Sequence, residues 1–167
     1  VTGKTCLDIG ASTGGFTDVL LEKGAHKVYA LDVGHDQLHQ KLRDNERVVT
    51  MEGVHIKDVS KKDFDEMIAC IVIDVSFISL EKVFPKAYEL LEQGGIVVAL
   101  IKPQFEVGRG EVGKGGIVKD PEKHDRVVRE VNDFAETCGL IAVATIESPI
   151  FGAEGNKEFL ALYERKH

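Results

Sequence analysis

Short apolar segments alternate with segments of helical periodicity along almost the whole chain, and this alternation restricts the fold more than any other feature. A strand that is apolar throughout must be covered on both faces, so such strands separated by helices predict a parallel sheet between two layers of helices. We expect parallel strands at residues 6–10, 27–33, 47–51, 69–75 and 96–101. We expect helices at residues 16–23, 37–43, 61–67, 80–91 and 121–138.

The last two expected strands, 140–146 and 158–163, are too close together for a helix to lie between them. We expect them to form an antiparallel pair, because parallel neighbours need a long crossover connection. The predicted fold is therefore α/β. It is one domain over residues 1–167, with a doubly wound, mostly parallel, seven-stranded, Rossmann-like sheet whose last strand is antiparallel.

Composition argues against several classes of protein. Apolar segments such as 96–101 are much shorter than a membrane span, and we expect neither a membrane segment nor a signal peptide. Three cysteines without Cys-x-x-Cys or close Cys/His spacing predict free thiols and no metal site. The formal net charge of -7 argues against a domain that holds nucleic acid by bulk charge alone. Residues 102–129 nevertheless contain seven Lys or Arg and five Asp or Glu, so a local basic surface remains an expectation.

A glycine-rich segment follows the first expected strand and precedes the first expected helix. This arrangement directs backbone N–H groups at a ligand, and Gly10, Gly14 and Gly15 let the chain approach that ligand closely. The spacing Gly-x-x-x-Gly-Gly differs from the Gly-x-Gly-x-x-Gly of dinucleotide-binding enzymes, and no Gly-Lys-Ser/Thr follows as in a P-loop. The segment therefore predicts a ligand site that is neither a dinucleotide-binding site nor a P-loop.

Two carboxylates flank the glycine-rich segment. Asp32 ends the second expected strand and can accept hydrogen bonds from both ribose hydroxyls of an adenosine; the alternative is a solvated acid at a strand end. Asp8 lies inside the first expected strand, where it could bind the ammonium of a methionine moiety and would repel a pyrophosphate; the alternative is a cap for a nearby backbone turn. Together they favour an adenosine linked to an amino acid over a dinucleotide.

Three more polar residues are expected at one edge of the sheet, although they lie far apart in the sequence. Asp74 ends the fourth expected strand, Lys102 follows the fifth, and Glu158 begins the last. The carboxyl ends of parallel strands share one edge, and an antiparallel last strand starts there, so the three side chains converge. Such a set can orient a hydroxyl for methyl transfer, with Lys102 either accepting its proton or stabilising the developing alkoxide as a cation. A purely structural ion-pair cluster is the alternative.

At these residues the chain resembles the FtsJ-like ribose 2'-O-methyltransferases, and within them it is most similar to the TlyA, or hemolysin A, family. The expected fold is also that of class I methyltransferases. The resemblance covers the full length of the chain, and its most specific motif is the Lys-Pro-Gln-Phe-Glu-x-Gly of residues 102–108. The other matching segments are residues 7–17, 31–34, 74–80, 113–121 and 155–158.

The resemblance implies S-adenosylmethionine as the cofactor, no metal, and a cytidine 2'-hydroxyl of ribosomal RNA as the methyl acceptor. It implies ribosomal RNA or a ribosomal subunit as the partner, and the cytoplasm as the location. The family has a Lys-Asp-Lys-Glu catalytic set, of which Asp74, Lys102 and Glu158 are found here. The residues implied to bind the cofactor are Asp8, Gly10, Ala11, Ser12, Thr13, Gly14, Phe16, Asp32, Val33 and Asp74.

The family also implies features upstream of the first strand. Lys4 lies too close to that strand to be the first Lys of the catalytic set. An N-terminal RNA-binding domain of the S4 type is expected upstream, and Val1 in place of an initiator Met suggests the catalytic part of a longer protein. Two rival interpretations stay open: a Rossmann-type oxidoreductase that uses NAD, and a non-enzymatic binding or hemolysin-like protein.

Several other side chains have two interpretations. Phe77 either contacts the cofactor or a target base, or packs in the core, and His55 either contacts an adenine or is an ordinary surface histidine. The basic side chains of residues 102–129 either contact RNA phosphates or face solvent. Those considered are Arg109, Lys114, Lys119, Lys123, Arg126 and Arg129.

Overall fold

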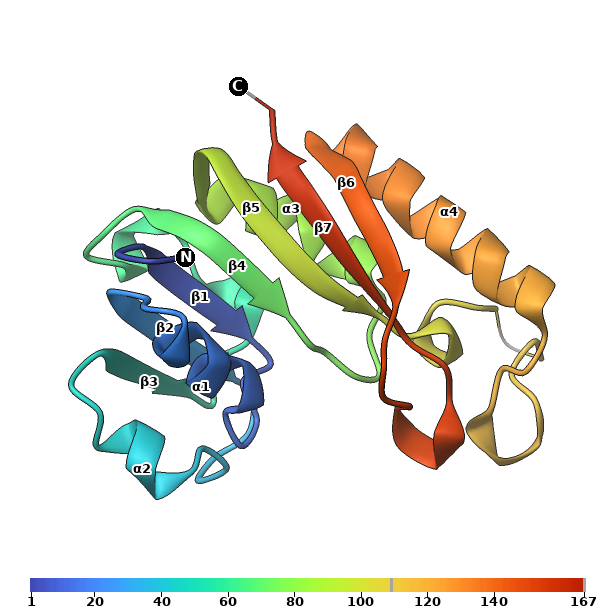
Figure 1. The fold of residues 1–167 in the computed structure, drawn as a ribbon, viewed down its shortest axis with the longest axis horizontal. Coiled ribbons are helices and arrows are strands. Elements are labelled where there is room, and N and C mark those ends of the chain that lie inside the picture. Colours follow the sequence, from blue (N-terminus) through green and yellow to red (C-terminus); the bar gives the residue numbers. More distant parts are fainter. Residues whose placement is uncertain (109, 167) are drawn as a thin grey trace.

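A seven-stranded sheet forms the centre of the computed structural model, which describes residues 1–108 and 110–166 (Figure 1). The strand order is β3-β2-β1-β4-β5-β7-β6. β7 is antiparallel to both of its neighbours, and the other neighbouring pairs are parallel, so the predicted fold is confirmed. The strands are β1 (Thr5–Ile9), β2 (Lys27–Asp32), β3 (Val48–Glu52), β4 (Ile68–Ile73), β5 (Leu91–Ile101), β6 (Leu140–Glu147) and β7 (Phe159–Arg165).

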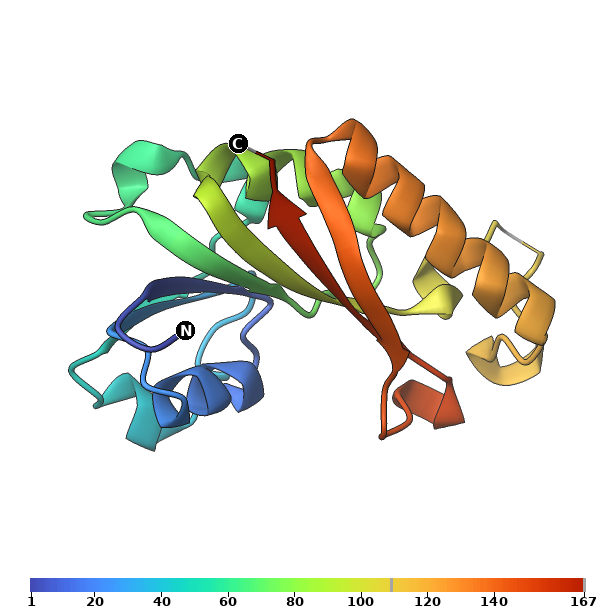
Figure 2. The same cartoon turned by 45° about the horizontal axis from the view of Figure 1, so that its top comes forward.

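Helices cover the sheet on both faces. The side chains of β1 alternate between the two resulting cores: Leu7 and Ile9 pack on the face covered by α3 and α4, and Cys6 packs on the face covered by α1 and α2. Figure 2 shows α3 and α4 on the same side of the sheet. The α-helices are α1 (Gly15–Glu22), α2 (Gln40–Arg43), α3 (Phe84–Leu90) and α4 (Pro121–Thr137).

The start and end of α4 are where the sequence predicts them. The Asp120 side chain accepts a hydrogen bond from the Glu122 backbone N–H, and Pro121 occupies the first turn, where no intrahelical N–H is needed. Gly139, with a φ of 93°, follows the helix and turns the chain into β6. The buried side chains of α4 recur at helical spacing and face the sheet: His124, Val127, Val131 and Ala135.

Three expected helices are shorter than predicted, and the first of them, 37–43, forms only α2. The segment 80–91 forms a 3-10 turn, η3 (Leu80–Lys82), followed by α3, because Pro85 lies in the first turn of α3 and starts a new helix there. The segment 61–67 forms only η2 (Lys61–Asp63), at whose start the Asp63 Oδ2 accepts from the Ser60 backbone N–H at 2.8 Å. β5 in turn starts at Leu91 rather than at residue 96, with a register shift opposite β4.

The order of the strands places a topological switch point between β1 and β4. From β1 the chain proceeds outward to β2 and β3, and from β4 it proceeds the other way to β5. Loops that leave neighbouring strands in opposite directions leave a crevice at the carboxyl edge, which is where ligands bind in such sheets. The switch point therefore fixes where the functional site is sought.

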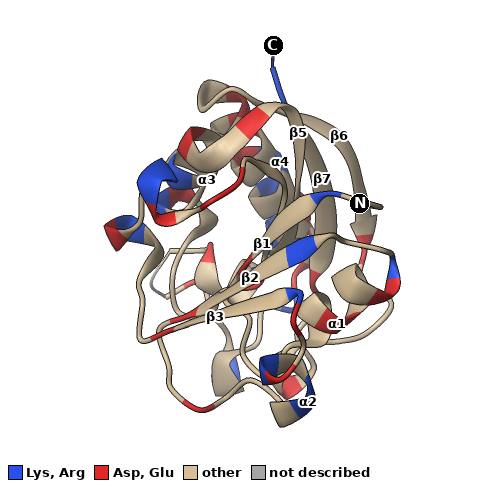
Figure 3. Ribbon diagram, turned by 90° about the vertical axis from the view of Figure 1, so that its left-hand side faces the viewer, with Lys and Arg blue, Asp and Glu red and all other residues tan. Residues whose placement is uncertain are grey.

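Figure 3 colours the charged residues on the ribbon, and both Lys/Arg and Asp/Glu occur on the elements near β1, β2 and β3. Within the described residues, no helix is both long and apolar enough to cross a membrane.

Candidate active site

A cavity of about 700 Å³ opens at the carboxyl edge of the sheet, beside the switch point between β1 and β4. Its walls come from the ends of β1, β2 and β4 and from the turn after β3. Its size and mixed lining are typical of a small-molecule site. The lining residues are Ile9, Gly10, Ser12, Leu31, Asp32, Val33, Gln37, His55, Ile56, Asp74, Val75, Ser76, Phe77, Ile78 and Val83.

The glycine-rich segment forms one wall of the cavity. Its first residues are anchored to β2, because the N–H groups of Gly10 and Ala11 both donate to the Leu31 carbonyl oxygen, at 2.9 and 3.0 Å. Gly10 has a φ of 83°, and a Cβ atom there would collide with the Asp74 carbonyl oxygen. Glycine is therefore needed at this position for the loop to lie against the end of β4.

Asp32 joins the glycine-rich segment to the end of β2. Its Oδ2 accepts from the Ser12 N–H and its Oδ1 accepts from the Gly34 N–H, both at 2.8 Å. Ser12 adopts a φ of 52°, an unusual conformation for a residue with a side chain, and the Asp32 carboxylate holds it there. Each carboxylate oxygen has a second lone pair, so Asp32, which lines the cavity, can still accept from a ligand hydroxyl.

Asp8 lies beneath the glycine-rich segment rather than in the cavity wall. Its side chain is fully buried on the α1 side of the sheet and accepts a hydrogen bond from the Thr17 hydroxyl at 2.7 Å, while Oδ1 has no partner among the described residues. Burial raises the pKa of Asp8 to about 7, and the nearby Asp74 and Asp32 add to that increase. Asp8 therefore titrates near neutral pH.

The other residues that the resemblance assigns to the cofactor are distributed around the loop. Val33 lines the cavity and Ala11 is buried behind it. Thr13 and Gly14 line a separate hollow of about 300 Å³ between α1 and α2, and Phe16 packs against the core on the α1 side. The structure thus brings Gly10, Ser12, Asp32, Val33 and Asp74 to the cavity, and it places Asp8, Ala11, Thr13, Gly14 and Phe16 around it.

Asp74, Lys102 and Glu158 come together at the same edge, as the sequence predicts. The Lys102 Nζ lies 2.5 Å from Asp74 Oδ1 and donates to the Ser76 Oγ at 3.1 Å. Glu158 is buried and lies against Gln104, whose Nε2 is 3.5 Å from Oε2 of Glu158. Burial raises the pKa of Glu158, and the positive charge of Lys102 opposes that increase. The cluster therefore places the Lys102 ammonium against the Asp74 carboxylate, with the Glu158 carboxylate near enough to interact with both charges.

Two members of this cluster are absent from the sequence-based prediction. Ser76 contacts the Lys102 ammonium, and Gln104 contacts Glu158. Both stand two residues beyond a predicted residue, inside segments 74–80 and 102–108, so the motifs contain them. Only the folded chain shows that their side chains point at the predicted residues.

Phe77 and His55 both line the cavity. Phe77 is 89% exposed, so packing in the core is excluded, and its φ of 64° is strained for an aromatic residue. Its ring packs against Phe105 with 5.0 Å between centroids. His55 caps the next turn, because its Nδ1 accepts from the Lys57 N–H at 3.1 Å.

The basic residues after β5 separate into two groups. Lys114, Lys119 and Lys123 line one hollow of about 260 Å³ together with acidic Glu111 and Asp120. Arg126 instead forms a two-point pair with Glu111, at 2.9 and 2.7 Å, so its charge is already used. Arg129 lies exposed on α4, and Arg109 lies outside the described residues.

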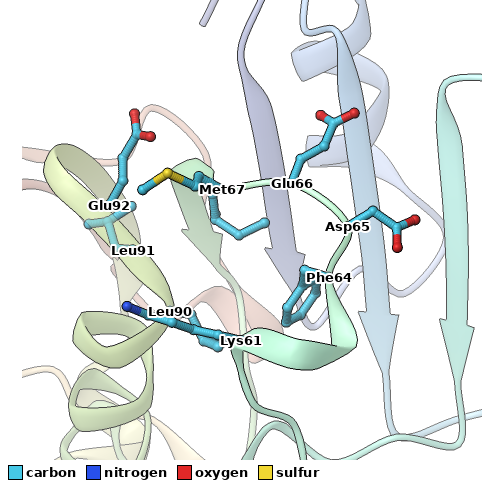
Figure 4. Close-up of a pocket in the computed structure, with 9 residues that line it drawn as sticks. Lys61, Phe64, Asp65, Glu66, Met67, Leu90, Leu91 and Glu92 are labelled. Atoms are coloured by element: carbon cyan, nitrogen blue, oxygen red, sulfur yellow. The ribbon is translucent and has the colours of Figure 1, made fainter.

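A smaller hollow of about 200 Å³ lies at the opposite edge of the sheet, where β4 and β5 begin (Figure 4). Figure 4 shows Glu66 and Glu92 pointing outward from it and Met67 between them. Glu66 is held by Lys27 and His26, at 3.6 and 3.4 Å. This hollow contains none of the predicted site residues. In the described residues, no group of three or more His, Cys, Asp or Glu is arranged to hold a metal ion.

The model of the FtsJ-like methyltransferase family matches residues 1–165. The chain is 51% identical over 162 residues to Hemolysin A of Brachyspira hyodysenteriae, covering 96% of this chain and 68% of that protein. It is 43% identical over 159 residues to the 16S/23S rRNA (cytidine-2'-O)-methyltransferase TlyA of Mycobacterium tuberculosis, covering 95% of this chain and 59% of that protein.

Solved structures of related proteins have the same fold as this chain. The crystal structure of a candidate hemolysin from Lactococcus lactis superimposes with a TM-score of 0.97 at 49% identity, covering 99% of this chain and 80% of that one. The N-methyltransferase NodS of Bradyrhizobium japonicum, at 14% identity and a TM-score of 0.69 over 99% of this chain and 80% of that one, shows the same fold. The chain spans 59% to 68% of the two sequence relatives described above. With a family model that matches almost every residue, the chain belongs to the FtsJ-like methyltransferases.

Proposed function

We propose that this chain transfers a methyl group from S-adenosylmethionine to a ribose 2'-hydroxyl of cytidine in ribosomal RNA. One observation carries the proposal: the Lys102–Asp74 pair stands at the rim of the cavity, with Asp74 in its wall and the exposed ring of Phe77 beside it. Asp32, Gly10, Ser12, Val33 and the residues around them would then hold the cofactor.

The cavity fits this cofactor in size and in the placement of its polar groups. Asp32 presents a carboxylate to ribose hydroxyls, and the apolar side chains of Leu31, Ile56 and Val75 can enclose an adenosine. Asp74 lies at the other end of the β1–β4 crevice, toward Lys102. The backbone of the glycine-rich segment lies between them. The buried, unpaired Oδ1 of Asp8 beneath that segment could accept from a ligand ammonium or from a water that contacts it.

The residues of the chain perform the positioning. The bound cofactor would supply a methyl that is already activated on a sulfonium, so the main requirement is to hold the hydroxyl oxygen in line with it. The Lys102 ammonium can donate to that oxygen and stabilise the negative charge that develops as the proton of the hydroxyl passes to solvent water. Asp74 and Ser76 fix the direction of the ammonium. Lys102 therefore acts as an orienting and stabilising cation.

Ribosomal RNA as the substrate is supported by the names of the relatives and by the exposed basic residues after β5. TlyA of Mycobacterium tuberculosis is described as acting on cytidines of 16S and 23S rRNA. Lys114 and Lys119 are exposed and line one hollow after β5, where they can contact RNA phosphates. We propose that an upstream S4-type domain contributes further RNA affinity and that the protein works in the cytoplasm, where ribosomal RNA is.

Calorimetric titration of the protein with S-adenosylmethionine, and with NAD as the comparison, tests the cofactor. Micromolar binding of S-adenosylmethionine that Asp32→Ala removes, with no binding of NAD, supports the proposal. Mapping 2'-O-methylcytidine in ribosomal RNA after incubation with the protein then tests the acceptor. Binding of NAD instead would favour an oxidoreductase. Methylation of a base with the riboses unmodified would refute the proposed acceptor.

A further inference from the structure

Glu106 connects two segments that carry the proposed active site, although it does not line the cavity. Its Oε1 accepts from the Leu80 N–H at 2.8 Å, and its Oε2 accepts from the Ser79 hydroxyl at 3.0 Å. Ser79 and Leu80 start η3, so the Glu106 carboxylate binds the amino end of that turn. Both oxygens of one side chain are thus used to hold a segment that precedes Glu106 by more than twenty residues.

The segments on either side of this contact touch at three points, which follow one another in the same residue order along both segments. We name them the β4 segment, residues 74–80, and the β5 segment, residues 102–106. Lys102 contacts Asp74 and Ser76 first, and the ring of Phe77 packs on Phe105 second. The third contact joins Ser79 and Leu80 to Glu106.

The third contact differs from the first two because it lies outside the reacting region. Ser79 and Glu106 do not line the cavity, whereas Asp74 and Phe77 do. Leu80 is 2% exposed, so the amino end of η3 is also fixed in the core. The β4 segment between Asp74 and Leu80 contains the strained backbone of Phe77, and such a conformation persists only where neighbouring contacts determine it.

Burying the Glu106 carboxylate costs desolvation free energy that a purely structural turn would not require. No ion pair to Glu106 is found in the described part of the chain, and burial raises its pKa to about 7 despite two hydrogen bonds. Glu81 on η3 is a further negative charge near it, and Tyr163 of β7 is the other titratable side chain affected. A leucine would avoid that desolvation but could not accept the two hydrogen bonds.

We propose that Glu106 is a positioning residue: its carboxylate holds the β4 segment against the β5 segment and thereby aligns Lys102 and Phe77 for methyl transfer. This inference rests on the proposed function for its catalytic consequence, but the alignment itself can be measured without a substrate. Glu106 touches neither substrate nor cofactor in this scheme. Its removal should therefore lower kcat and leave cofactor affinity intact.

Glu106→Leu removes both acceptors, and Glu106→Gln is the conservative replacement. The amide oxygen of Gln can accept from Leu80, and its amide nitrogen can donate to the Ser79 oxygen. We expect Glu106→Leu to lower kcat about 30-fold, because a small misplacement of reacting groups has effects of that order. We expect Glu106→Gln to recover kcat to within about threefold of the parent, with KM for S-adenosylmethionine changed less than about twofold in both. Ser79→Ala, which leaves Glu106 intact, should lower kcat by about fivefold.

A fluorescent reporter makes the alignment measurable by itself. The protein contains no tryptophan, so Phe77→Trp introduces a single one on the exposed part of the β4 segment. Fluorescence anisotropy of that tryptophan should fall when Glu106→Leu is added, because the β4 segment moves more freely. It should stay unchanged when Glu106→Gln is added instead. Glu81→Gln, which removes a nearby charge and neither hydrogen bond, is the matched control and should change nothing.

The outcomes separate the inference from the proposed function. An unchanged anisotropy with Glu106→Leu overturns the positioning role, as does a Gln variant that loses as much kcat as the Leu variant. A parent protein without methyl transfer refutes the proposed function, and the anisotropy series still decides whether Glu106 holds the segment. If Glu106→Leu does not fold, as judged by circular dichroism, Ser79→Ala removes one of the two hydrogen bonds, and an unchanged kcat and anisotropy with that variant overturn the positioning role.

Discussion

The ammonium of Lys102 lies 2.5 Å from a carboxylate oxygen of Asp74, which joins the carboxyl ends of β5 and β4 directly above the proposed cofactor cavity. Lys102 is well buried in this pair and also contacts Ser76. A charge held by two neighbours is fixed in direction before any substrate arrives, which is the condition for electrostatic stabilisation of a developing alkoxide.

Removing that ammonium should abolish the reaction and spare the cofactor. We expect Lys102→Met to lower kcat for RNA methylation by about 100-fold or more, a loss typical of one preorganised donor, with the affinity for S-adenosylmethionine nearly unchanged. Single-turnover transfer of a radiolabelled methyl group measures the rate of methylation, and calorimetry measures the affinity for S-adenosylmethionine. Lys61→Met, which changes a lysine near the opposite edge of the sheet, is the control. Retained methylation with Lys102→Met would remove Lys102 from the mechanism.

Loss of the Asp32 carboxylate should weaken the binding of S-adenosylmethionine. Asp32→Ala leaves the N–H groups of Ser12 and Gly34 without their acceptor and removes the acceptor expected for ribose hydroxyls. We expect the Kd for S-adenosylmethionine to rise about 100-fold, the effect of losing two hydrogen bonds to a charged group. Asp36→Asn is the matched control, because the Asp36 side chain is 95% exposed and Asn tolerates its positive φ. Equal affinities for the two variants would argue for another cofactor-binding carboxylate.

Gly152 leaves the space that the Glu158 side chain fills. A Cβ atom at Gly152 would overlap the Glu158 carboxylate, although the backbone φ of -82° accepts any residue. Gly152→Ala should therefore displace Glu158 and lower kcat about tenfold, with little loss of stability. Gly155→Asn in the same loop is the control, since nothing lies within 4 Å of that position and Asn tolerates its φ of 81°. A crystal structure of the Ala variant with Glu158 unmoved would contradict this account.

Asp8 should make the stability of the unliganded protein depend on pH. Burial raises its pKa from 3.8 to about 7, so the protonated form is the one that the folded state favours. The stabilisation is full below about pH 4 and is lost as the pH rises through about 7. Asp8→Asn removes this titration, and its free energy of unfolding relative to the parent should rise by roughly 2–3 kcal/mol between pH 5 and pH 8. Urea unfolding at the two pH values measures it, and a difference that stays constant would show that Asp8 does not titrate there.

The lysines near the start of α4 should contribute to RNA affinity through phosphates. Replacing both Lys114 and Lys119 by Gln should weaken RNA binding and lower the slope of log K against log salt by about 1.5, the effect of two lost phosphate contacts. Lys61 and Lys62, which lie on η2 near the opposite edge of the sheet, give a control of equal charge change. Filter binding over a series of salt concentrations compares the two double variants. Identical slopes would place the RNA elsewhere.

The sequence by itself determined the sheet, its antiparallel end and which polar residues meet at its carboxyl edge. Apolar runs and helical periods are local patterns, so they can be read without knowing what packs on them. They fail only where neighbours compete with periodicity, as at Pro85, which divides an expected helix, and at Leu91, which pairs with β4 although Gly94 and Gly95 follow it.

The tertiary structure decided how the predicted residues are used. Sequence placed Asp8 beside the glycine-rich segment, and the alternation of side chains along β1 puts its carboxylate beneath that segment on the α1 side, where Thr17 donates to it. Sequence could not show that Ser76, Gln104 and Glu106 point at their partners, because those contacts join segments separated by many residues. Periodicity depends on neighbours along the chain and is therefore written in the sequence, whereas the direction of a loop side chain depends on contacts that exist only after the sheet has formed.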